Sequence, residues 1–303
     1  MSEDIYVRLA EFLDKMPGGY PKTPSGVEIR ILKKLFTPEQ AEIAMKLKPI
    51  LEPVKNIAER LGMPESEAAE KLERMAKEGS IYRVRAGDQA LYMAMQFIVG
   101  IYEFHLNSMD RELAEMMEEY LPHFGPMWLK APTRQMRVVP VDSSIEGKTS
   151  VAPYNIIKAL VKEQEIISNA PCICRKEKTL LGEQCDRPRD LCFQFGMAAQ
   201  YYIENGMGKQ ISVEEALKLF DKAEEAGLVL SSTNSQQIMG VCCCCKCCCG
   251  ILRNVGKFDR PADIVHSFYQ AKIDPELCSA CETCIERCQI DAITEGDEVM
   301  EVS

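Results

Sequence analysis

The segment "VCCCCKCCCG", residues 241–250, places seven cysteines within ten positions. They lie between Val241 and Gly250 and are Cys242, Cys243, Cys244, Cys245, Cys247, Cys248 and Cys249. Crowded free thiols oxidise or cross-link unless something binds them. The segment therefore predicts either a metal or cluster site or a redox-sensitive stretch.

The side chains of this segment cannot all point the same way. Alternate residues of an extended strand share a face, so we expect Cys242, Cys244 and also Cys248 on one side, with the other four elsewhere. A looped segment would instead wrap a C-x-CC pattern around one metal. An iron–sulfur cubane takes four thiolates, so seven cysteines cannot serve one cubane. Cys243 is the most dispensable, because Cys242, Cys244, Cys245, Cys247 and Cys248 already form the pattern C-x-CC-x-CC.

Four further cysteines lie upstream, separated by one, ten and six residues: Cys172, Cys174, Cys185 and Cys192. Together the eleven cysteines between residues 172 and 249 suffice for two four-cysteine clusters with three to spare. We expect one or two clusters here. The predicted metal ligands are Cys172, Cys174, Cys185, Cys192, Cys242, Cys244, Cys245, Cys247, Cys248 and Cys249. A polynuclear zinc–thiolate store and a thiol redox switch remain alternatives.

A second cysteine pattern, "CSACETCIERCQIDAI", begins at residue 278. Its cysteines have the spacing C-x2-C-x2-C-x3-C, which is typical of bacterial 4Fe-4S sites; zinc sites favour two paired C-x2-C knuckles. The predicted cluster-binding residues are Cys278, Cys281, Cys284 and Cys288. Residues 273–294 resemble the bacterial-type 4Fe-4S ferredoxin family.

Two features depart from that family. Gln289 occupies the place where proline usually follows the run, and no second run follows. The chain stops at "ITEGDEVMEVS", so we expect a shortened chain, a Cys288 that returns to the same cluster, or an upstream cysteine that completes it. Over most of its length, including "TPSGVEIRILKKLFTPEQAEIAMKL" and "FIVGIYEFHLN", the chain resembles cysteine-rich, ferredoxin-domain 4Fe-4S proteins of anaerobic bacteria and archaea. The resemblance implies no specific reaction.

The N-terminal region has the pattern of three helices and a β-hairpin. Helices are predicted in "TPEQAEIAMKL", "PVKNIAERLG" and "PESEAAEKLERMAKEG", and a hairpin turn at Gly87-Asp88. This order resembles the winged helix-turn-helix superfamily. The third helix carries five glutamates against three basic residues, and Arg83 and Arg85 alone favour a phosphate contact. We therefore expect a structural or dimerisation module here and no nucleic-acid partner.

Composition gives the setting. The chain has 303 residues, 46% hydrophobic content, fifteen cysteines and a net charge of −10. It shows no signal-peptide core and no apolar run of about 18 residues, so we expect a cytoplasmic protein without a membrane segment. We therefore do not expect the cysteines to form disulfides, because disulfides are rare in the cytoplasm. The negative charge argues against binding to nucleic acid or anionic lipid.

We predict an α+β fold. It comprises a winged-helix-like domain (1–100), a helical and looped connection (101–168), a cysteine-rich cluster-binding domain (169–260) and a 4Fe-4S ferredoxin-like module with a βαβ fragment (261–303). His105, His123 and Trp128 are expected to pack rather than to bind a cofactor. Arg175, Lys176 and Lys178 are expected to offset the charge of a cluster.

These patterns predict an electron-transfer protein that carries one 4Fe-4S cluster and one or two more, and that passes single electrons to a redox partner protein in an anaerobic cytoplasm. No phosphate loop and no Ser/His/Asp set is present. Two alternatives remain: a redox-sensing winged-helix regulator, and a reductase with an open iron in the central cluster. A homodimer is possible.

Overall fold

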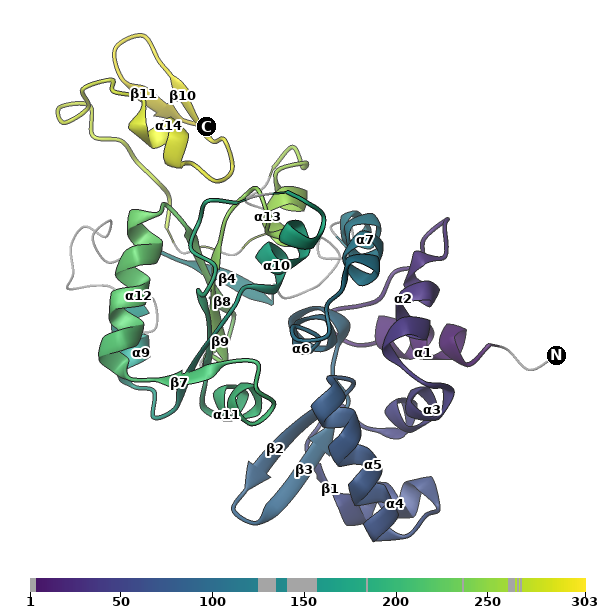
Figure 1. Cartoon of the computed structure of the whole chain (residues 1–303). Coiled ribbons are helices and arrows are strands. Elements are labelled where there is room, and N and C mark those ends of the chain that lie inside the picture. The colour runs from purple at the N-terminus through teal and green to yellow at the C-terminus, as the bar shows by residue number, and fades with distance from the viewer. Residues whose placement is uncertain are drawn as a thin grey trace.

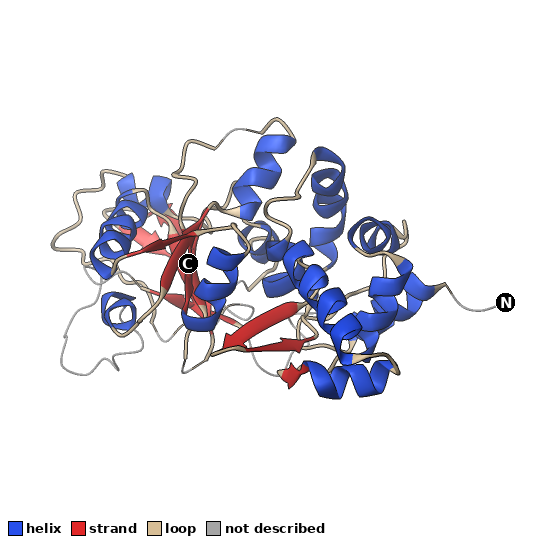
Figure 2. Ribbon diagram, turned by 60° about the horizontal axis from the view of Figure 1, so that its bottom comes forward, coloured by secondary structure: helices blue, strands red, loops and turns tan. Residues whose placement is uncertain are grey.

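The structure, a computed structural model, describes residues 4–124, 135–140, 157–183, 185–235, 237–260, 265, 267 and 269–303. Trp128 lies outside these residues. Helices surround two antiparallel sheets, and the C-terminal segment lies at one end of the molecule (Figure 1, Figure 2).

The N-terminal part is mainly helical, and the capping and glycine residues identified in the sequence begin or end three of its helices. Thr37 and Gln40 form a reciprocal capping box at the start of the third helix. Gly62 and Gly79 end the next two helices in the left-handed conformation that glycine tolerates best. The helices are α1 (Ile5–Asp14), α2 (Val27–Leu35), α3 (Pro38–Lys46), α4 (Val54–Leu61) and α5 (Glu65–Glu78).

A small sheet completes this part. Strands β2 (Tyr82–Ala86) and β3 (Gln89–Met93) form a hairpin around Gly87-Asp88, and β1 (Glu52–Pro53) pairs with β3. Gly87 has φ of 60°, as a two-residue hairpin turn requires. The predicted order of helices and hairpin is present. Membership of the winged-helix superfamily stays a prediction.

The chain then passes through an irregular turn into a second helical segment. Residues Phe97–Ile101 form a π-type turn in which Val99 has φ of 57° and ψ of 58°. This left-handed conformation is unusual for a β-branched residue. The helices that follow are α6 (Tyr102–Phe104), α7 (Arg111–Tyr120) and the 3-10 turn η2 (Leu121–His123).

The cysteine-rich part is built on a six-stranded antiparallel sheet with the order β4-β8-β9-β6-β5-β7. The strands are β4 (Met136–Val139), β5 (Ile167–Ala170), β6 (Cys192–Phe195), β7 (Lys209–Ile211), β8 (Val229–Thr233) and β9 (Gly240–Cys244). The segment predicted as a connection thus contributes an edge strand and the start of β5. The predicted boundary at residue 168 falls inside β5. The sequence does not indicate the edge strand β4, because its four residues include Arg137 and form no long apolar run.

Helices cover both faces of this sheet. Apolar residues of α9 (Ile157–Lys162) and α12 (Val213–Glu225) form a core with Phe193, Val241 and Cys243. The other face carries α10 (Ile173–Leu180) and α13 (Gly250–Val255) and lies toward α6 and α7 (Figure 1). Helix α11 (Gly196–Glu204) joins the N-terminal core, where the Tyr201 hydroxyl donates to the Ala76 carbonyl at 2.7 Å.

The C-terminal module consists of α14 (Thr283–Arg287) and the antiparallel pair β10 (Ile293–Glu295) and β11 (Met300–Val302). The predicted βαβ fragment is wrong, since no strand precedes α14 within residues 269–282. Ala280 and Glu282 adopt left-handed φ values of 51° and 61°, so this stretch is wound into a loop that cannot extend as a strand.

Candidate metal centres

Strand β9 sorts the first cysteines of the 241–250 segment onto two faces. Cys242 pairs with Cys192 on β6 and with Ser231 on β8, so β9 is a central strand. Cys243 points to the opposite face and packs in the apolar core, 2% exposed. Its predicted lack of a ligand role agrees with this position.

The alternation ends where the strand ends. The backbone N–H groups of Cys248 and Cys249 both donate to the carbonyl of Cys245, at 3.3 and 3.0 Å, so residues 245–249 form a turn. This turn carries Cys248 away from Cys242 and Cys244 and brings Cys249 to them instead. The expected grouping of Cys248 with Cys242 and Cys244 is therefore wrong, because the period of two applies only as far as residue 244.

The turn builds a compact four-cysteine group, defined as Cys185, Cys245, Cys247 and Cys248. All four Sγ atoms lie within 4.8 Å of one another. The Sγ of Cys185 is 3.9 Å from that of Cys245 and 3.5 Å from that of Cys247. A tetrahedral ion with metal–sulfur bonds of about 2.3 Å holds its sulfurs about 3.8 Å apart. This geometry fits one tetrahedral metal ion.

A buried cation stands beside this group. The Nη2 of Arg175 donates to the carbonyl of Cys243 at 2.9 Å and lies 3.5 Å from the Sγ of Cys245. A hydrogen bond from Cys248, followed by the charge of Arg175, lowers the pKa of Cys245 to about 4. Thiolates are the form that binds metal, so the site favours ligation.

The two lysines predicted to share this role have other partners. Lys176 donates its Nζ to the carbonyl of Leu106, and Lys178 pairs with Glu118 and Glu183. Of the three basic residues after Cys174, Arg175 is the one that contacts a cysteine sulfur among the described residues.

A second set of six cysteines lines one cavity on the opposite side of Arg175. We call it the six-cysteine ring and define it by the thiol–thiol contacts that join its members: Cys172, Cys174, Cys192, Cys242, Cys244 and Cys249. Cys243, Cys245 and Cys248 also line this cavity. Cys172 precedes α10, Cys192 opens β6, and Cys249 precedes α13. Thiol–thiol hydrogen bonds alternate around the ring. They lower the pKa values of the acceptors, Cys172, Cys242 and Cys249, and raise those of the donors, Cys174, Cys192 and Cys244.

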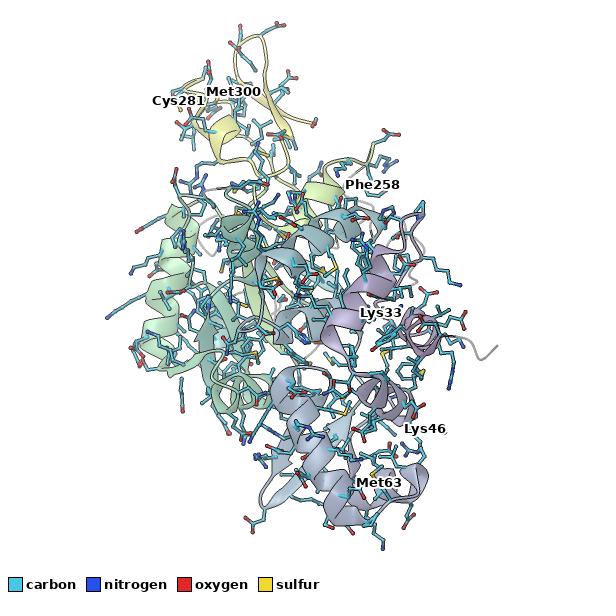
Figure 3. All side chains as sticks on the ribbon, turned by 45° about the vertical axis from the view of Figure 1, so that its right-hand side comes forward. Lys33, Lys46, Met63, Phe258, Cys281 and Met300 are labelled. Carbon is cyan, nitrogen blue, oxygen red and sulfur yellow. The ribbon has the colours of Figure 1, made fainter. Side chains whose placement is uncertain are left out.

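The C-terminal run, Cys278, Cys281, Cys284 and Cys288, lies at the far end of the molecule from Met63 (Figure 3). Cys281 is exposed, and its hydrogen bonds with the side chain and backbone of Thr283 lower its pKa to about 7. The backbone N–H of Ala292 donates to the Sγ of Cys288 at 3.2 Å. Backbone donors to sulfur and four thiols on a wound loop fit a 4Fe-4S cluster.

The module is attached to the sheet domain through residues next to this run. The backbone N–H of Lys246 donates to the Oε1 of Gln289 at 2.9 Å, and its Nζ pairs with Asp291. Arg287 donates to the carbonyls of Glu224 and Glu225 at the end of α12. Cationic groups at a helix C-terminus are stabilising. These contacts place the C-terminal run beside the turn that carries the four-cysteine group.

Comparison with known proteins identifies part of this arrangement. Residues 271–294 match the 4Fe-4S binding domain family, Fer4. No curated protein and no solved structure matches the chain. The protein therefore carries a 4Fe-4S binding domain near its C-terminus and is an iron–sulfur protein; we call residues 271–294 the Fer4 module. No helix among the described residues has the length and apolar character needed to cross a bilayer.

The N-terminal residues considered for function serve the fold. His105 is buried, with Nδ1 2.7 Å from the carbonyl of Ile101, and burial lowers its pKa. Arg83 is 1% exposed and pairs with Glu73 and Glu204 at 2.7 and 2.6 Å; Arg85 pairs with the same carboxylates. Both arginines are engaged within the chain, which removes the feature that favoured a phosphate contact.

Sequence spacing alone could not have divided the eleven central cysteines into these sets. The signal that separates them is the end of β9, which no residue in "CCCCKCCC" marks. The sequence indicates a charge-balancing role for Arg175, but its place beside both cysteine sets depends on its contacts with the Cys243 carbonyl and the Cys245 sulfur.

Proposed function

We propose that the protein is an electron carrier in which single electrons enter or leave through the Fer4 module and pass to a second iron–sulfur site in the cysteine-rich sheet domain. The observation that carries this proposal is the pair of contacts from Lys246 to Gln289 and Asp291. They hold the Fer4 module against the turn that follows β9. Electron transfer needs centres held in a fixed relative position, and these contacts fix the position of the Fer4 module relative to this turn.

The surface around the Fer4 cysteines suits a protein partner. Residues 271–303 contain nine acidic and two basic residues, a net charge of −7. Leu277, directly before Cys278, is 83% exposed, and Ile290 is 40% exposed. An apolar contact within an acidic surface favours a redox partner with a basic docking face, whose association would weaken as salt rises. We place this exchange in an anaerobic cytoplasm, because exposed clusters are oxidised by oxygen.

The ion pairs of Arg83 and Arg85 give no support to the alternative function, a redox-sensing winged-helix regulator.

The experiment begins with protein purified without oxygen and reduced with dithionite. Iron and sulfide content and the EPR spectrum are measured before and after the change Cys281→Ala. We expect the loss of one cluster's signal and slower reduction of a soluble one-electron acceptor. An unchanged iron content and an unchanged rate would exclude the Fer4 module as the port for electrons.

A further inference from the structure

The six-cysteine ring has no member in common with the four-cysteine group or the Fer4 module. Its six cysteines line one cavity of about 80 Å³, and Cys245 and Cys248 of the four-cysteine group line the same cavity. A cavity needs about 10–15 Å³ for one water molecule, so this one has room for several atoms. Side chains from β6, β9, α10 and α13 converge on it, although they come from residues as far apart as 172 and 249.

Each sulfur of the ring contacts its neighbours in the ring and does not contact all the others. Contacts run from Cys172 to Cys174, then to Cys249, Cys244, Cys242 and Cys192. Among the described residues, the four-cysteine group is the set whose sulfurs all lie within 4.8 Å, and the ring does not share that compactness. A single ion with metal–sulfur bonds of about 2.3 Å needs a compact set. The six sulfurs of the wider ring surround a space that suits a cofactor larger than one metal ion.

A buried cation with unused donors faces the same cavity. Arg175 lines it and is 2% exposed. Its Nη2 is bonded, but its Nε and Nη1 have no hydrogen-bond partner among the described residues. Buried donors without partners cost free energy, so they are expected to meet an acceptor that completes the site. Inorganic sulfide and thiolate are acceptors with the negative charge that Arg175 would balance.

The backbone beside the ring is held in an unusual conformation. Val99 lines the cavity with a left-handed φ of 57°, and the Gln96 side chain donates to the carbonyls of Ile98 and Val99 at 2.8 and 3.4 Å. Such conformations persist where the surroundings fix them, and they cluster at ligand sites. The segment therefore shapes one wall of the cavity.

We infer that the six-cysteine ring holds one iron–sulfur cofactor with more than four irons. Each iron of a cubane takes one cysteine thiolate, so a single cubane would leave two of the six ring thiols without a ligand role. All six line the same cavity, and each contacts at least one other member of the ring, so no two of them are set apart as surplus to a cubane. This inference deepens the proposed function and rests on it for its iron–sulfur chemistry.

The decisive measurement uses the full chain with the Fer4 ligands removed by Cys278→Ser, Cys281→Ser, Cys284→Ser and Cys288→Ser. Iron, zinc and acid-labile sulfide per chain are measured after purification without oxygen. We expect more than four sulfides per chain to remain, since a single ion at the four-cysteine group contributes none. Four sulfides or fewer, or zinc without sulfide, would overturn the inference.

Single changes in this Fer4-deleted parent assign the cofactor to the ring. Cys244→Ser should remove most of the remaining sulfide, whereas the matched change Cys243→Ser, one residue away on the other face of β9, should leave it in place. Equal sulfide in both variants contradicts the inference. If Cys244→Ser does not fold, the sulfide count of the parent decides together with Cys247→Ser in the same parent: more than four sulfides should remain after that change, and four or fewer would overturn the inference. Failure of electron transfer would leave that count unchanged, so the two proposals can fail independently.

Discussion

The side-chain oxygen of Gln289 accepts a hydrogen bond from the backbone N–H of Lys246, 43 residues earlier in the chain, at 2.9 Å. Gln289 is 7% exposed and follows Cys288 directly, at the position where ferredoxin runs usually have proline. Proline could not accept this bond from its side chain. The residue that departs from the family pattern is thus one of the residues that attach the Fer4 module to the cysteine-rich turn, together with Asp291.

We predict that Gln289→Leu loosens this attachment while the Fer4 cluster remains bound. The change removes the acceptor but keeps a similar volume, and one buried donor left unpaired costs about 1–3 kcal/mol. Hydrogen exchange at the Lys246 amide should become about tenfold faster or more, since 1.4 kcal/mol corresponds to a factor of ten. Asp291→Asn is the control. It removes an exposed ion pair and should change the exchange rate little.

The four-cysteine group is predicted to hold one tetrahedral ion. Cys247→Ser should then release a single metal atom per chain and no sulfide, because its exposed thiol is one of four ligands within 4.8 Å. Elemental analysis and sulfide determination on the same sample check this. A loss of about four irons with matching sulfide would show a cubane in this position instead.

Part of this arrangement could be predicted from the sequence, and part could not. The Fer4 run could be predicted because a local spacing in one loop defines it, and the capping residues Thr37 and Gln40 marked a helix start without tertiary information. The division of the central cysteines could not be predicted, because it depends on where β9 stops pairing with β8.

Contacts between elements far apart in the sequence likewise could not be predicted from local sequence patterns. Cys185 contacts Cys245, 60 residues later in the chain, and also Cys247. Arg175 on α10 donates to the Cys243 carbonyl on β9, and β4 joins the sheet as a four-residue edge strand. The sequence predicts only that Cys243 is surplus to a spacing pattern. The structure places it in an apolar core, a position that the spacing does not indicate.

That position of Cys243 gives a matched pair of variants for the Fer4 module. Cys281→Ala should lose about four irons per chain, because a cubane lacking one thiolate on an exposed loop is labile. Cys243→Ala should keep the full metal content and lose about 1 kcal/mol of stability through the small cavity it leaves. Iron loss from Cys243→Ala would show that this thiol is a ligand after all.

The paired arginines of the N-terminal hairpin should differ sharply in their effect on stability. Arg83→Met leaves Glu73 and Glu204 without their buried partner. Since those carboxylates are 27% and 26% exposed and can recruit water, we expect a loss of about 2–3 kcal/mol in the free energy of unfolding. Arg85→Met, 38% exposed beside the same carboxylates, should cost less than about 1 kcal/mol. Urea unfolding at low and high salt measures both losses. Equal losses of stability in the two variants would contradict the conclusion that the ion pairs of Arg83 are the more important ones.

Glu177 on α10 should make the stability of the protein fall as pH rises toward neutrality. Its carboxyl is 1% exposed, accepts a hydrogen bond from the Tyr102 hydroxyl, and lies 4.0 Å from Arg253. Burial outweighs these contacts and raises the pKa of Glu177 from 4.5 to about 7. The folded chain thus holds this proton more tightly than the unfolded chain does.

The sign of the pH dependence follows from this difference in proton binding. Below pH 4.5 both states are protonated and the contribution of Glu177 is fully present. Between pH 4.5 and 7 the unfolded state releases the proton first, so stability declines, and above pH 7 the decline ends. The total is on the order of 2–3 kcal/mol. In Glu177→Gln the amide still accepts from Tyr102 but does not titrate, so this part of the pH dependence should disappear.

The measurement is the urea midpoint of wild type and Glu177→Gln at pH 5, 6, 7 and 8, in protein of equal metal content. The two should agree near pH 5, and the variant should be the more stable at pH 8. Glu183→Gln is the control, because Glu183 also pairs with Lys178 but is 58% exposed and should leave the pH profile unchanged. A Glu177→Gln variant that tracks wild type at every pH would mean that Arg253 and Lys178 neutralise the buried carboxylate, and that Glu177 is ionised in the folded protein at neutral pH.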